Sequence, residues 1–562
     1  MDIGTAKFPA YLPFILNDIS SSCFIAMDFE LSGLAFPPSE RLETPTVQER
    51  YLEAKVAAER YQILQVGLAI CHENSTTATY TLKPYNFNIS PITDPGTNVN
   101  RDWVFGSRSM EFLLAQGFSI DTMCKTGIRY LSREEEASAI QIAVEKSRSR
   151  TTIPDIKIQE DDIECLKFLQ SSRLTINEWL AEGENRQEWL NIPPPASLPS
   201  PPCEIPLGLS NTQKRLVHQL ISIEYPGLTS RGAPDFVQIQ DRDPESERRV
   251  FETKLKTRKQ RIRNNIGFRW IAEALVGGNF DELDPEAFNP LLKRIENPTL
   301  DVQQISERVK SQLRRNRPVL VGHNMFFDLL FFYRCFIGSL PDTLEEFNGA
   351  IHELFPVLAD TKYMATHDCG VMAQQSALED LNRNLAHLEY PKIEIDTRFT
   401  KYRTRRCAHE AGYDSLLTAL AFIKLAGNLQ RNPAICSSVE EMHSEKSGSL
   451  FAIAMQQLDR QILSAKSESH NFLEQGRDVI PTIDEGQIAV PGRSWEDNGD
   501  RQITSLANRG KLVPRLGTIF WANYGNKLRV FGTQEGIIRV VDRQVKEEEA
   551  KEIKVGILID ID

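Results

Sequence analysis

The segment from 317 to 338, RPVLVGHNMFFDLLFFYRCFIG, constrains the fold more than any other stretch of this 562-residue chain. Its apolar start has the length of a buried strand, the Gly-His-Asn that follows is typical of a turn, and the remainder favours an apolar helix. Asp328 is the only carboxylate in the segment. Because an ionised Asp is costly in apolar surroundings, its position requires a compensating partner or a wet helix face.

Other segments indicate that this strand–turn–helix belongs to a larger mixed α/β fold. Short apolar runs separated by polar turns fit consecutive strands of a meander, at 23–31, 61–73 and 77–85. Helices are expected at 109–145, 302–316 and 409–429, and a strand that enters a helix is expected at 355–365. Strands followed by helices and by a strand–turn–helix predict a central sheet with helices packed on it.

The length of the chain predicts several domains rather than one core. The proline-rich stretch IPPPASLPSPPCEIP, residues 192–206, cannot form a regular element and indicates a loop or linker. We expect a discontinuous core of 1–158 and 262–432, an inserted small domain of 159–261, a flexible linker of 433–505 and a small C-terminal β or α/β module of 506–562. Strands of that module are expected at 517–524, 527–533 and 536–542.

Composition excludes several classes of protein. The net charge of −12 argues against a protein that coats nucleic acid by charge alone. The nine cysteines contain no CxxC pair, so neither a zinc site nor a disulfide framework is indicated. No run reaches the ~18 apolar residues needed to cross a bilayer. The N-terminus lacks a basic region followed by an apolar run. We therefore expect a protein of the nucleus, the cytoplasm or both, neither secreted nor inserted in a membrane.

Asp28 and Glu30 stand two residues apart in an apolar strand. Because side chains alternate along a strand, both carboxylates project from the same face. On a buried face they repel each other unless a cation neutralises them. The alternative is an edge strand whose polar face lies in water.

Three further residues complete a possible catalytic group. Asp328 lies four residues after Asn324 of the turn, Asp414 opens the helix at 409–429, and His409 precedes Asp414 by five positions. Taken singly, these acids suit a solvated helix face or a favourable interaction with a helix dipole, and a lone His is usually structural. Taken together with Asp28 and Glu30, four carboxylates can hold two divalent ions while a neutral His removes a proton from water. Oxygen ligands suit Mg²⁺ or Mn²⁺.

Six stretches in chain order resemble the poly(A)-specific ribonuclease family, within the wider group of Asp-Glu-Asp-Asp exonucleases that use a catalytic His. They are FIAMDFELSGL, LQVGLAI, FLLAQGFSIDTMCKTGIRYLSREEE, VGHNMFFDLLFF, LFPVLADTKYMA and HEAGYDSLLTALAFI. The resemblance implies a ribonuclease-H-like exonuclease core with a mixed central sheet. It also implies that Asp28, Glu30, Asp328 and Asp414 are the ligands of two Mg²⁺ or Mn²⁺ ions. His409 would be the general base.

The resemblance also suggests where RNA would bind. Ser32, Gly33 and Asn324 would contact the substrate near the acids. The inserted domain resembles the family's small single-strand-binding domain, whose characteristic pair aligns with Lys214 and His218 in TQKRLVHQL, with Lys in place of Arg. Lys lacks the planar fork with which Arg grips phosphate. In the C-terminal module, Trp521 and Phe531 are expected either to stack bases or to pack in a core.

The leading hypothesis is therefore a metal-dependent 3′-to-5′ exoribonuclease that acts on single-stranded RNA with a 3′-hydroxyl, shortens poly(A) tails and releases 5′-AMP. A second hypothesis keeps this chemistry but trims the 3′ ends of small or structured non-coding RNA. A third is an inactive scaffold that binds RNA or a partner nuclease. The resemblance further implies a homodimer.

Overall fold

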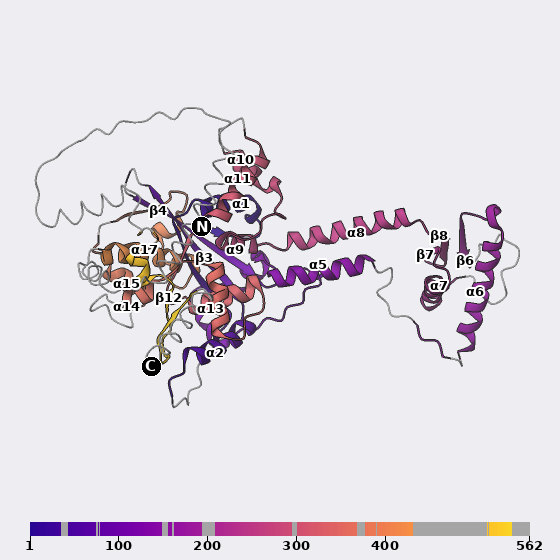
Figure 1. Ribbon diagram of the computed structural model, residues 1–562, viewed down its shortest axis with the longest axis horizontal. Helices are drawn as coiled ribbons and strands as arrows, with labels where there is room; N and C mark the ends of the chain where they lie inside the picture. The colour runs from indigo at the N-terminus through magenta and orange to yellow at the C-terminus, as the bar shows by residue number, and fades with distance from the viewer. Residues whose placement is uncertain are drawn as a thin grey trace, which may run out of the picture. The chain divides into compact units, whose positions relative to one another are not determined.

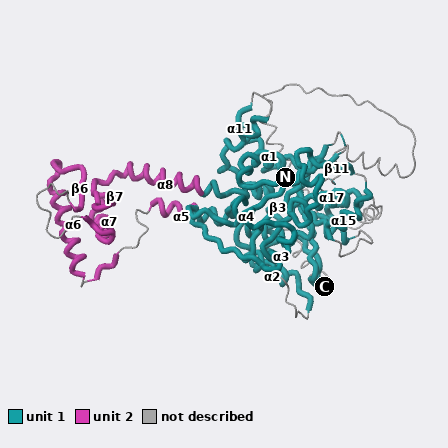
Figure 2. The backbone as a smooth tube through the Cα atoms, turned by 180° about the vertical axis from the view of Figure 1, so that it is seen from behind, with its two compact units in different colours: residues 1–139, 262–562 teal, residues 140–261 magenta. Residues whose placement is uncertain are grey.

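The computed structural model describes residues 1–34, 43–74, 77, 79–148, 156–159, 162–193, 208–294, 300–367, 377–388, 391–430, 514, 516 and 518–541. The chain divides into two compact units, coloured separately in Figure 2: unit 1 is 1–139 with 262–562, and unit 2 is 140–261. Unit 2 begins earlier than the inserted domain we expected at 159–261, because helix α5 (Arg133–Arg148) continues from unit 1 into unit 2. The linker predicted at 433–505 lies outside the described residues.

A mixed eight-stranded sheet forms the centre of unit 1 (Figure 1), as the sequence predicts. Its main path runs β1-β4-β3-β2-β9-β10, and β11 and β5 also pair with β4. Strands β2, β3 and β4 are antiparallel neighbours, whereas β9 runs parallel to β2 and β10 parallel to β9. The strands are β1 Asp2–Ile3, β2 Phe24–Leu31, β3 Ile63–Asn74, β4 Thr79–Ser90, β5 Ile128–Arg129, β9 Val319–Gly322, β10 Leu358–Asp360 and β11 Lys392–Ile395.

Apolar clusters cover both faces of this sheet. Along β2, Ile25 and Met27 belong to one cluster, whereas Phe24 and Ala26 belong to the other. The alternation follows the two-residue period of a strand and explains why β2 is buried on both sides over its first half. The sheet is therefore the middle layer of a three-layer α/β unit.

Helices of unit 1 divide between these two clusters. The first cluster includes side chains of α1 Phe8–Ser20, α2 Val47–Arg60, α9 Arg269–Val276, α10 Asn289–Leu292, α11 Val302–Arg315, α12 Phe326–Phe332 and α13 Leu344–Leu354. The second includes side chains of α14 Thr361–Thr366, α15 Leu378–Asn384, α16 Lys401–Thr404 and α17 Ala411–Gln430. Two short helices, α3 Ser107–Ala115 and α4 Ile120–Thr126, form a small separate cluster. No helix in the described part of the chain is both long and apolar enough to span a membrane.

Unit 2 is a small α/β structure. Its antiparallel sheet has the order β6-β8-β7, with β6 Trp189–Ile192, β7 Leu228–Gly232 and β8 Val237–Asp241. Helices α6 Ile163–Ala181 and α7 Asn211–Glu224 pack on it through one apolar cluster that includes Ile176, Leu220 and Ile239. Helix α8 Pro244–Asn264 leads back to unit 1.

The C-terminal segment differs from its prediction in two ways. The stretch expected as a strand at 517–524 contains helix α21, Ile519–Tyr524, because Phe520 and Tyr524 stand one helical turn apart and are buried on one side. Strands β12 Lys527–Arg529 and β13 Ile537–Arg539 follow, as an antiparallel hairpin within the two ranges predicted for them.

The described part of this segment also belongs to unit 1 instead of forming a module of its own. Strand β10 ends the path of the central sheet, so its outer backbone groups need partners. The backbone N–H of Asn526 donates to the carbonyl of Leu358 at 2.9 Å, and the Asn526 side-chain oxygen accepts from the N–H of Leu358 at 2.7 Å. The segment thus covers the edge of β10.

Trp521 provides a test of this packing. Its side chain is 1% exposed, and its indole N–H donates to the carbonyl of Pro514 at 2.7 Å. Trp521→Ala should lower the free energy of unfolding of unit 1 by about 3–5 kcal/mol. Trp189→Ala is the matched control because Trp189 is 48% exposed in unit 2. Urea unfolding followed by hydrogen exchange of β10 and α17 measures the effect. Equal, small effects of both substitutions would show that the C-terminal helix is not part of the core.

Candidate active site

Strand β2 carries two acids on the face that packs against α17. Phe24 and Ala26 of β2 contact the α17 cluster, and Asp28 and Glu30 continue the same row of side chains. Strand β9 pairs with β2 only as far as Ala26. Both acids therefore lie just beyond that pairing, half-buried, at the carboxyl ends of the parallel strands.

A close approach between β3 and α17 brings a third acid to these two. Gly67 pairs with Asp28, and a Cβ atom at position 67 would lie 1.7 Å from the carbonyl oxygen of Ala411. Any larger residue would thus push the first turn of α17 away from the sheet. As a result, carboxylate oxygens of Asp28, Glu30 and Asp414 all lie within 4.8 Å of one another.

Two side-chain amides hold the start of α17 in this place. The side-chain oxygen of Gln65 accepts from the backbone N–H of Ala411 at 3.0 Å, and that of Asn86 accepts from Gly412 at 3.1 Å. N–H groups in the first turn of a helix have no partner within the helix, so these amides satisfy them. Gln65 is also paired with Glu30 across the sheet. The strands next to the acids therefore determine where the helix begins.

The fourth acid, Asp328, comes from the strand–turn–helix segment. The turn between β9 and α12 is closed by Asp360, whose carboxylate accepts from the backbone N–H of Asn324 at 2.8 Å. Asn324 has a φ of 59°, in the left-handed region that Asn tolerates better than most residues. Asp328 stands outside the tight group of three acids. After burial, its charge is nevertheless the largest cause of the raised pKa of Asp28, so it lies close to the group.

All four acids are harder to ionise than free carboxylic acids. Burial is the main cause, and for Asp28 and Glu30 the charges of the other acids raise the pKa further. Burial raises the pKa of Asp328 and that of Asp414 to about 7 each. Among the described residues, no Lys or Arg forms an ion pair with any of the four. Such a group gains most from a bound cation, and its oxygen atoms suit Mg²⁺ or Mn²⁺. The residues therefore fit a divalent-metal site.

His409 lies at the rim of the acid group. Its backbone N–H donates to Oδ2 of Asp414 at 3.1 Å, in a left-handed backbone conformation with a φ of 60°. The imidazole is exposed and meets the ring of Phe112 edge to face, with 4.7 Å between ring centroids. An exposed imidazole beside carboxylates can take a proton from water.

Ser32 and Gly33, which are expected to contact RNA, also stabilise the local structure. The Ser32 side chain is fully buried, its hydroxyl donates to the carbonyl of Val104 at 2.7 Å, and it accepts from the N–H of Gln62 at 2.9 Å. These two bonds hold the loop before α3 against β2, and RNA contact at Ser32 and Gly33 stays a prediction. Gly33 is needed because a Cβ there would lie 2.4 Å from the ring of Tyr61. Asn324, in contrast, is exposed in the turn four residues before Asp328.

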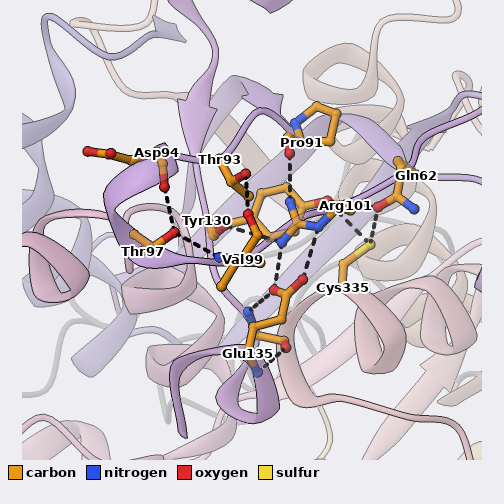
Figure 3. Close-up of polar contacts among 11 residues, drawn as sticks. Gln62, Pro91, Thr93, Asp94, Thr97, Val99, Arg101, Tyr130, Glu135 and Cys335 are labelled. Atoms are coloured by element: carbon orange, nitrogen blue, oxygen red, sulfur yellow. Dashed lines mark hydrogen bonds and ion pairs between the residues drawn. The ribbon is translucent and has the colours of Figure 1, made fainter. Parts of the chain in front are cut away.

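Arg101 anchors the loop that leads to α3 (Figure 3). Its guanidinium donates to both carboxylate oxygens of Glu135, at 3.1 and 2.6 Å, and to the carbonyl of Pro91 at 2.9 Å. The same group lies 4.4 Å from the ring centroid of Tyr130. A bidentate, largely buried Arg–carboxylate pair of this kind is strong and directional. It fixes the approach to α3 and so the place of Phe112 beside His409.

Lys214 and His218 lie in unit 2, on α7. The Lys214 ammonium donates to the carbonyl of Pro234 at 2.8 Å, and the Nδ1 atom of His218 is 2.8 Å from the hydroxyl of Ser230. Burial and the charge of Lys214 lower the pKa of His218. Both side chains thus fix the loop between β7 and β8 and the end of β7. RNA binding by this pair stays a prediction.

Sequence reasoning missed several residues that build the site. Gly67 and Gln65 lie in LQVGLAI, and Asp360 lies in LADTKYMA. An interruption of an apolar strand by Gln and Gly is a detectable signal, because either residue weakens a buried strand unless something requires it. Asp360 was detectable too, because a carboxylate between a short strand and a helix is typical of a helix cap. Phe112 gave no such signal, since an exposed aromatic in a short helix is ordinary.

Known proteins are similar to this chain over most of its length. The family described as CAF1 family ribonuclease matches residues 3–422. The poly(A)-specific ribonuclease PARN of Xenopus laevis is 26% identical over 459 residues, which cover 76% of this chain and 63% of the relative. The human PARN is 26% identical over 449 residues, covering 76% and 62%. This chain thus spans about 63% of the length of the Xenopus relative.

Two other similar proteins have different names. The pre-piRNA 3′-exonuclease trimmer of Bombyx mori is 23% identical over 435 residues, which cover 76% of this chain and 71% of the relative. Among solved structures, S. pombe Pop2p in its Mg²⁺- and Mn²⁺-bound form aligns at 12% identity and a TM-score of 0.33, over 75% of this chain and 89% of that one. Since the family match extends over residues 3–422, most of the chain, this protein belongs to the CAF1 family of ribonucleases.

Proposed function

We propose that this protein is a divalent-metal-dependent 3′-to-5′ exoribonuclease that shortens poly(A) tails and releases 5′-AMP. The observation that carries the proposal is the approach of Asp28, Glu30 and Asp414 to within 4.8 Å, with Asp328 nearby and no cationic side chain paired to them in the described part of the chain. The family match and the PARN relatives support it. The order of three antiparallel strands beside two parallel ones supports a ribonuclease-H-like core.

In this proposal the four acids hold two Mg²⁺ or Mn²⁺ ions. When bound, such ions activate water and stabilise charge on the leaving 3′ oxygen. The protein itself keeps the four carboxylates together against their repulsion. Gly67 and Gln65 do so by fixing the start of α17, and Asp360 by fixing the turn before α12.

His409 acts as the general base. Its main-chain bond to Asp414 keeps the imidazole at the rim of the acid group, and its exposure gives water access to the ring. Contact with Phe112 limits the positions that the ring can take. A neutral imidazole in this place takes the proton of the attacking water and returns it to solvent.

The substrate is single-stranded RNA with a free 3′-hydroxyl. Asn324 is exposed in the turn before Asp328 and offers a side-chain amide to the terminal nucleotide. Lys214 and His218 of unit 2 offer a second RNA contact, in line with the resemblance of this unit to single-strand-binding domains. The homodimer that the resemblance implies and the nuclear or cytoplasmic location expected from the composition remain predictions.

Trimming of small or structured non-coding RNA is a second candidate function. The similarity to the pre-piRNA trimmer of Bombyx mori favours it, because that similarity covers the same share of this chain as the similarity to PARN. The chemistry would be the same, so only the substrate separates the two. An inactive scaffold is disfavoured because the four acids and His409 are all present.

The raised pKa values of Asp328 and Asp414 predict how the stability of the metal-free protein depends on pH. Without metal, the folded protein holds protons on Asp328 and Asp414 up to about pH 7, whereas the unfolded chain releases them near pH 4. Its stability should therefore fall as the pH rises through this window. Asp328→Asn mimics the protonated acid, so at pH 8 the metal-free variant should be more stable than the wild type by on the order of 2 kcal/mol.

Thermal melts at pH 4 and pH 8, with and without Mn²⁺, measure this effect. The variant and the wild type should melt alike at pH 4, and Mn²⁺ should stabilise the wild type at pH 8 far more than the variant. Asp342→Asn is the matched control, since the Asp342 side chain is 94% exposed and pairs with Lys55. If Mn²⁺ does not change the melting temperature of the wild type, the proposed metal site is contradicted.

Loss of one ligand should abolish cleavage without unfolding the protein. Asp28→Asn should reduce release of mononucleotide from 3′-hydroxyl RNA in Mg²⁺ by roughly a thousandfold or more, while Asp342→Asn leaves the rate unchanged. Chromatography of the products and a thermal melt of each variant are the measurements. If the purified wild type releases no 5′-mononucleotide, the enzymatic proposal fails.

A substrate series separates the two candidate functions. Oligomers of equal length that end in A₁₅ or in mixed sequence, and a hairpin RNA with a short 3′ overhang, are digested under the same conditions. A tail-shortening enzyme should degrade the A-tailed oligomer at least about tenfold faster, corresponding to about 1.4 kcal/mol of discrimination. Equal rates on mixed or structured RNA would favour trimming of non-coding RNA.

A further inference from the structure

The C-terminal segment meets the candidate active site through one carboxylate. Strands β2, β9 and β10 are parallel, so their carboxyl ends lie at the same edge of the sheet. Asp360 ends β10, and the backbone N–H groups that its carboxylate accepts include those of Asn324 at 2.8 Å, Lys362 at 2.9 Å and Arg529 at 3.0 Å. Arg529 belongs to β12, outside residues 3–422 of the family match. The hairpin is thus fixed one side chain away from the turn that leads to Asp328.

Phe531 is an exposed aromatic residue at the tip of this hairpin. Its side chain is 40% exposed, and two cations lie against the ring, the guanidinium of Arg529 at 5.0 Å and the ammonium of Lys362 at 5.4 Å from the centroid. The tip is tied down by two hydrogen bonds of 2.9 Å each to the start of α2, one from Gln534 N–H to the Pro45 carbonyl and one from Val47 N–H to the Glu535 carboxylate. Phe531 is therefore presented on a rigid support.

Arg529 has unused hydrogen-bonding capacity. Among the described residues, no carboxylate forms an ion pair with its guanidinium, and its Nε–H is buried without a hydrogen-bond partner. A guanidinium carries five N–H donors, and a buried donor without an acceptor is unfavourable. A phosphate group is a suitable acceptor for the terminal N–H groups of this planar, permanently charged side chain, whereas the buried Nε–H is out of its reach.

We propose that Arg529 and Phe531 form an RNA-binding site for the strand upstream of its 3′ end, with a base stacked on Phe531 and a phosphate bound by Arg529. This inference rests on the proposed exonuclease function. An aromatic face beside a guanidinium is the usual arrangement for single-stranded nucleic acid, because each nucleotide offers a flat base and an anionic phosphate. In a chain of net charge −12, whose cleavage site is acidic, such local contacts supply the attraction that the whole protein lacks.

The site should favour long substrates over short ones. Every base has a stacking face, so Phe531 would bind the strand whatever its sequence. A substrate of two nucleotides would occupy the acid group and gain little from the hairpin, whereas a substrate of fifteen would reach both. The C-terminal segment would therefore increase the affinity for long RNA substrates. Any preference for adenine would arise from other residues.

Oligoadenylates of two and fifteen nucleotides test the proposal on the full-length protein. Fluorescence anisotropy without divalent ions measures binding of A₁₅, and product release in Mg²⁺ gives kcat/KM for A₂ and A₁₅. Arg529→Ala and Phe531→Leu should each weaken A₁₅ binding about tenfold, and the ratio of kcat/KM for A₁₅ to that for A₂ should fall by about the same factor. Phe531→Trp keeps a stacking face and should retain the binding.

Arg539→Ala is the matched control, because Arg539 is exposed on β13 of the same hairpin. It should bind and cleave A₁₅ like the wild type. The proposal is overturned if Arg529→Ala and Phe531→Leu bind A₁₅ like the wild type, or if Arg539→Ala weakens binding as much as they do. It is also overturned if Phe531→Leu instead changes the sedimentation of the protein and leaves RNA binding intact, since the ring would then be a protein contact. A wild type that binds A₁₅ but releases no mononucleotide would refute the proposed function alone.

Discussion

Repulsion among half-buried carboxylates is the constraint on which the rest of unit 1 depends. Asp28 and Glu30 lie on a face that is otherwise apolar, and Asp414 approaches them from a helix that packs on the same face. Without a cation, this arrangement opposes folding, because burial and neighbouring charges disfavour ionisation. Apolar clusters on both faces of the sheet must therefore hold the acids together. A divalent ion bound among these acids, as we propose, would offset the stability lost at this place.

The contacts that hold the first turn of α17 make the position of Asp414 rigid. Gly67 permits close contact between β3 and α17, and Gln65 and Asn86 accept hydrogen bonds from the first turn of that helix. These contacts are made by backbone and by short side chains within the sheet, so they leave little freedom for Asp414. His409 differs, because only its backbone is bonded to the acid group, while its exposed ring contacts Phe112. The proposed ligands are thus fixed, whereas the proposed general base is open to proton exchange with water.

Much of this could be predicted from the sequence, and the failures have physical causes. The spacing of Asp28 and Glu30 fixes their common face, because the period of a strand is local. The approach of Asp414 and Asp328 depends on contacts between segments hundreds of residues apart, so only the family resemblance suggested it. Ser32 shows what a resemblance does not reveal: its hydroxyl donates to Val104 and accepts from Gln62, and these contacts became visible only in the structure.

The C-terminal segment was misjudged for a related reason. A strand and a short amphipathic helix have similar apolar content over six residues, and only packing distinguishes them. In the structure, the outer edge of β10 binds Asn526, and this contact places the aromatic residues of α21 against the core. A sequence pattern reports the burial of side chains within one element. It does not report that the edge of β10 has unpaired backbone groups, because these arise only when the whole sheet has formed.

Asp360 connects these observations. One carboxylate accepts hydrogen bonds from the catalytic turn, from the start of α14 and from β12, so the positions of all three are coupled. Burial raises the pKa of Asp360 to about 6, while the N–H groups that it accepts favour the ionised form. Losing any one donor would leave a buried acid less well satisfied and the remaining contacts weaker. Strand β12 therefore does more than cover the edge of the sheet. It is held by the same Asp360 carboxylate that holds the turn before Asp328.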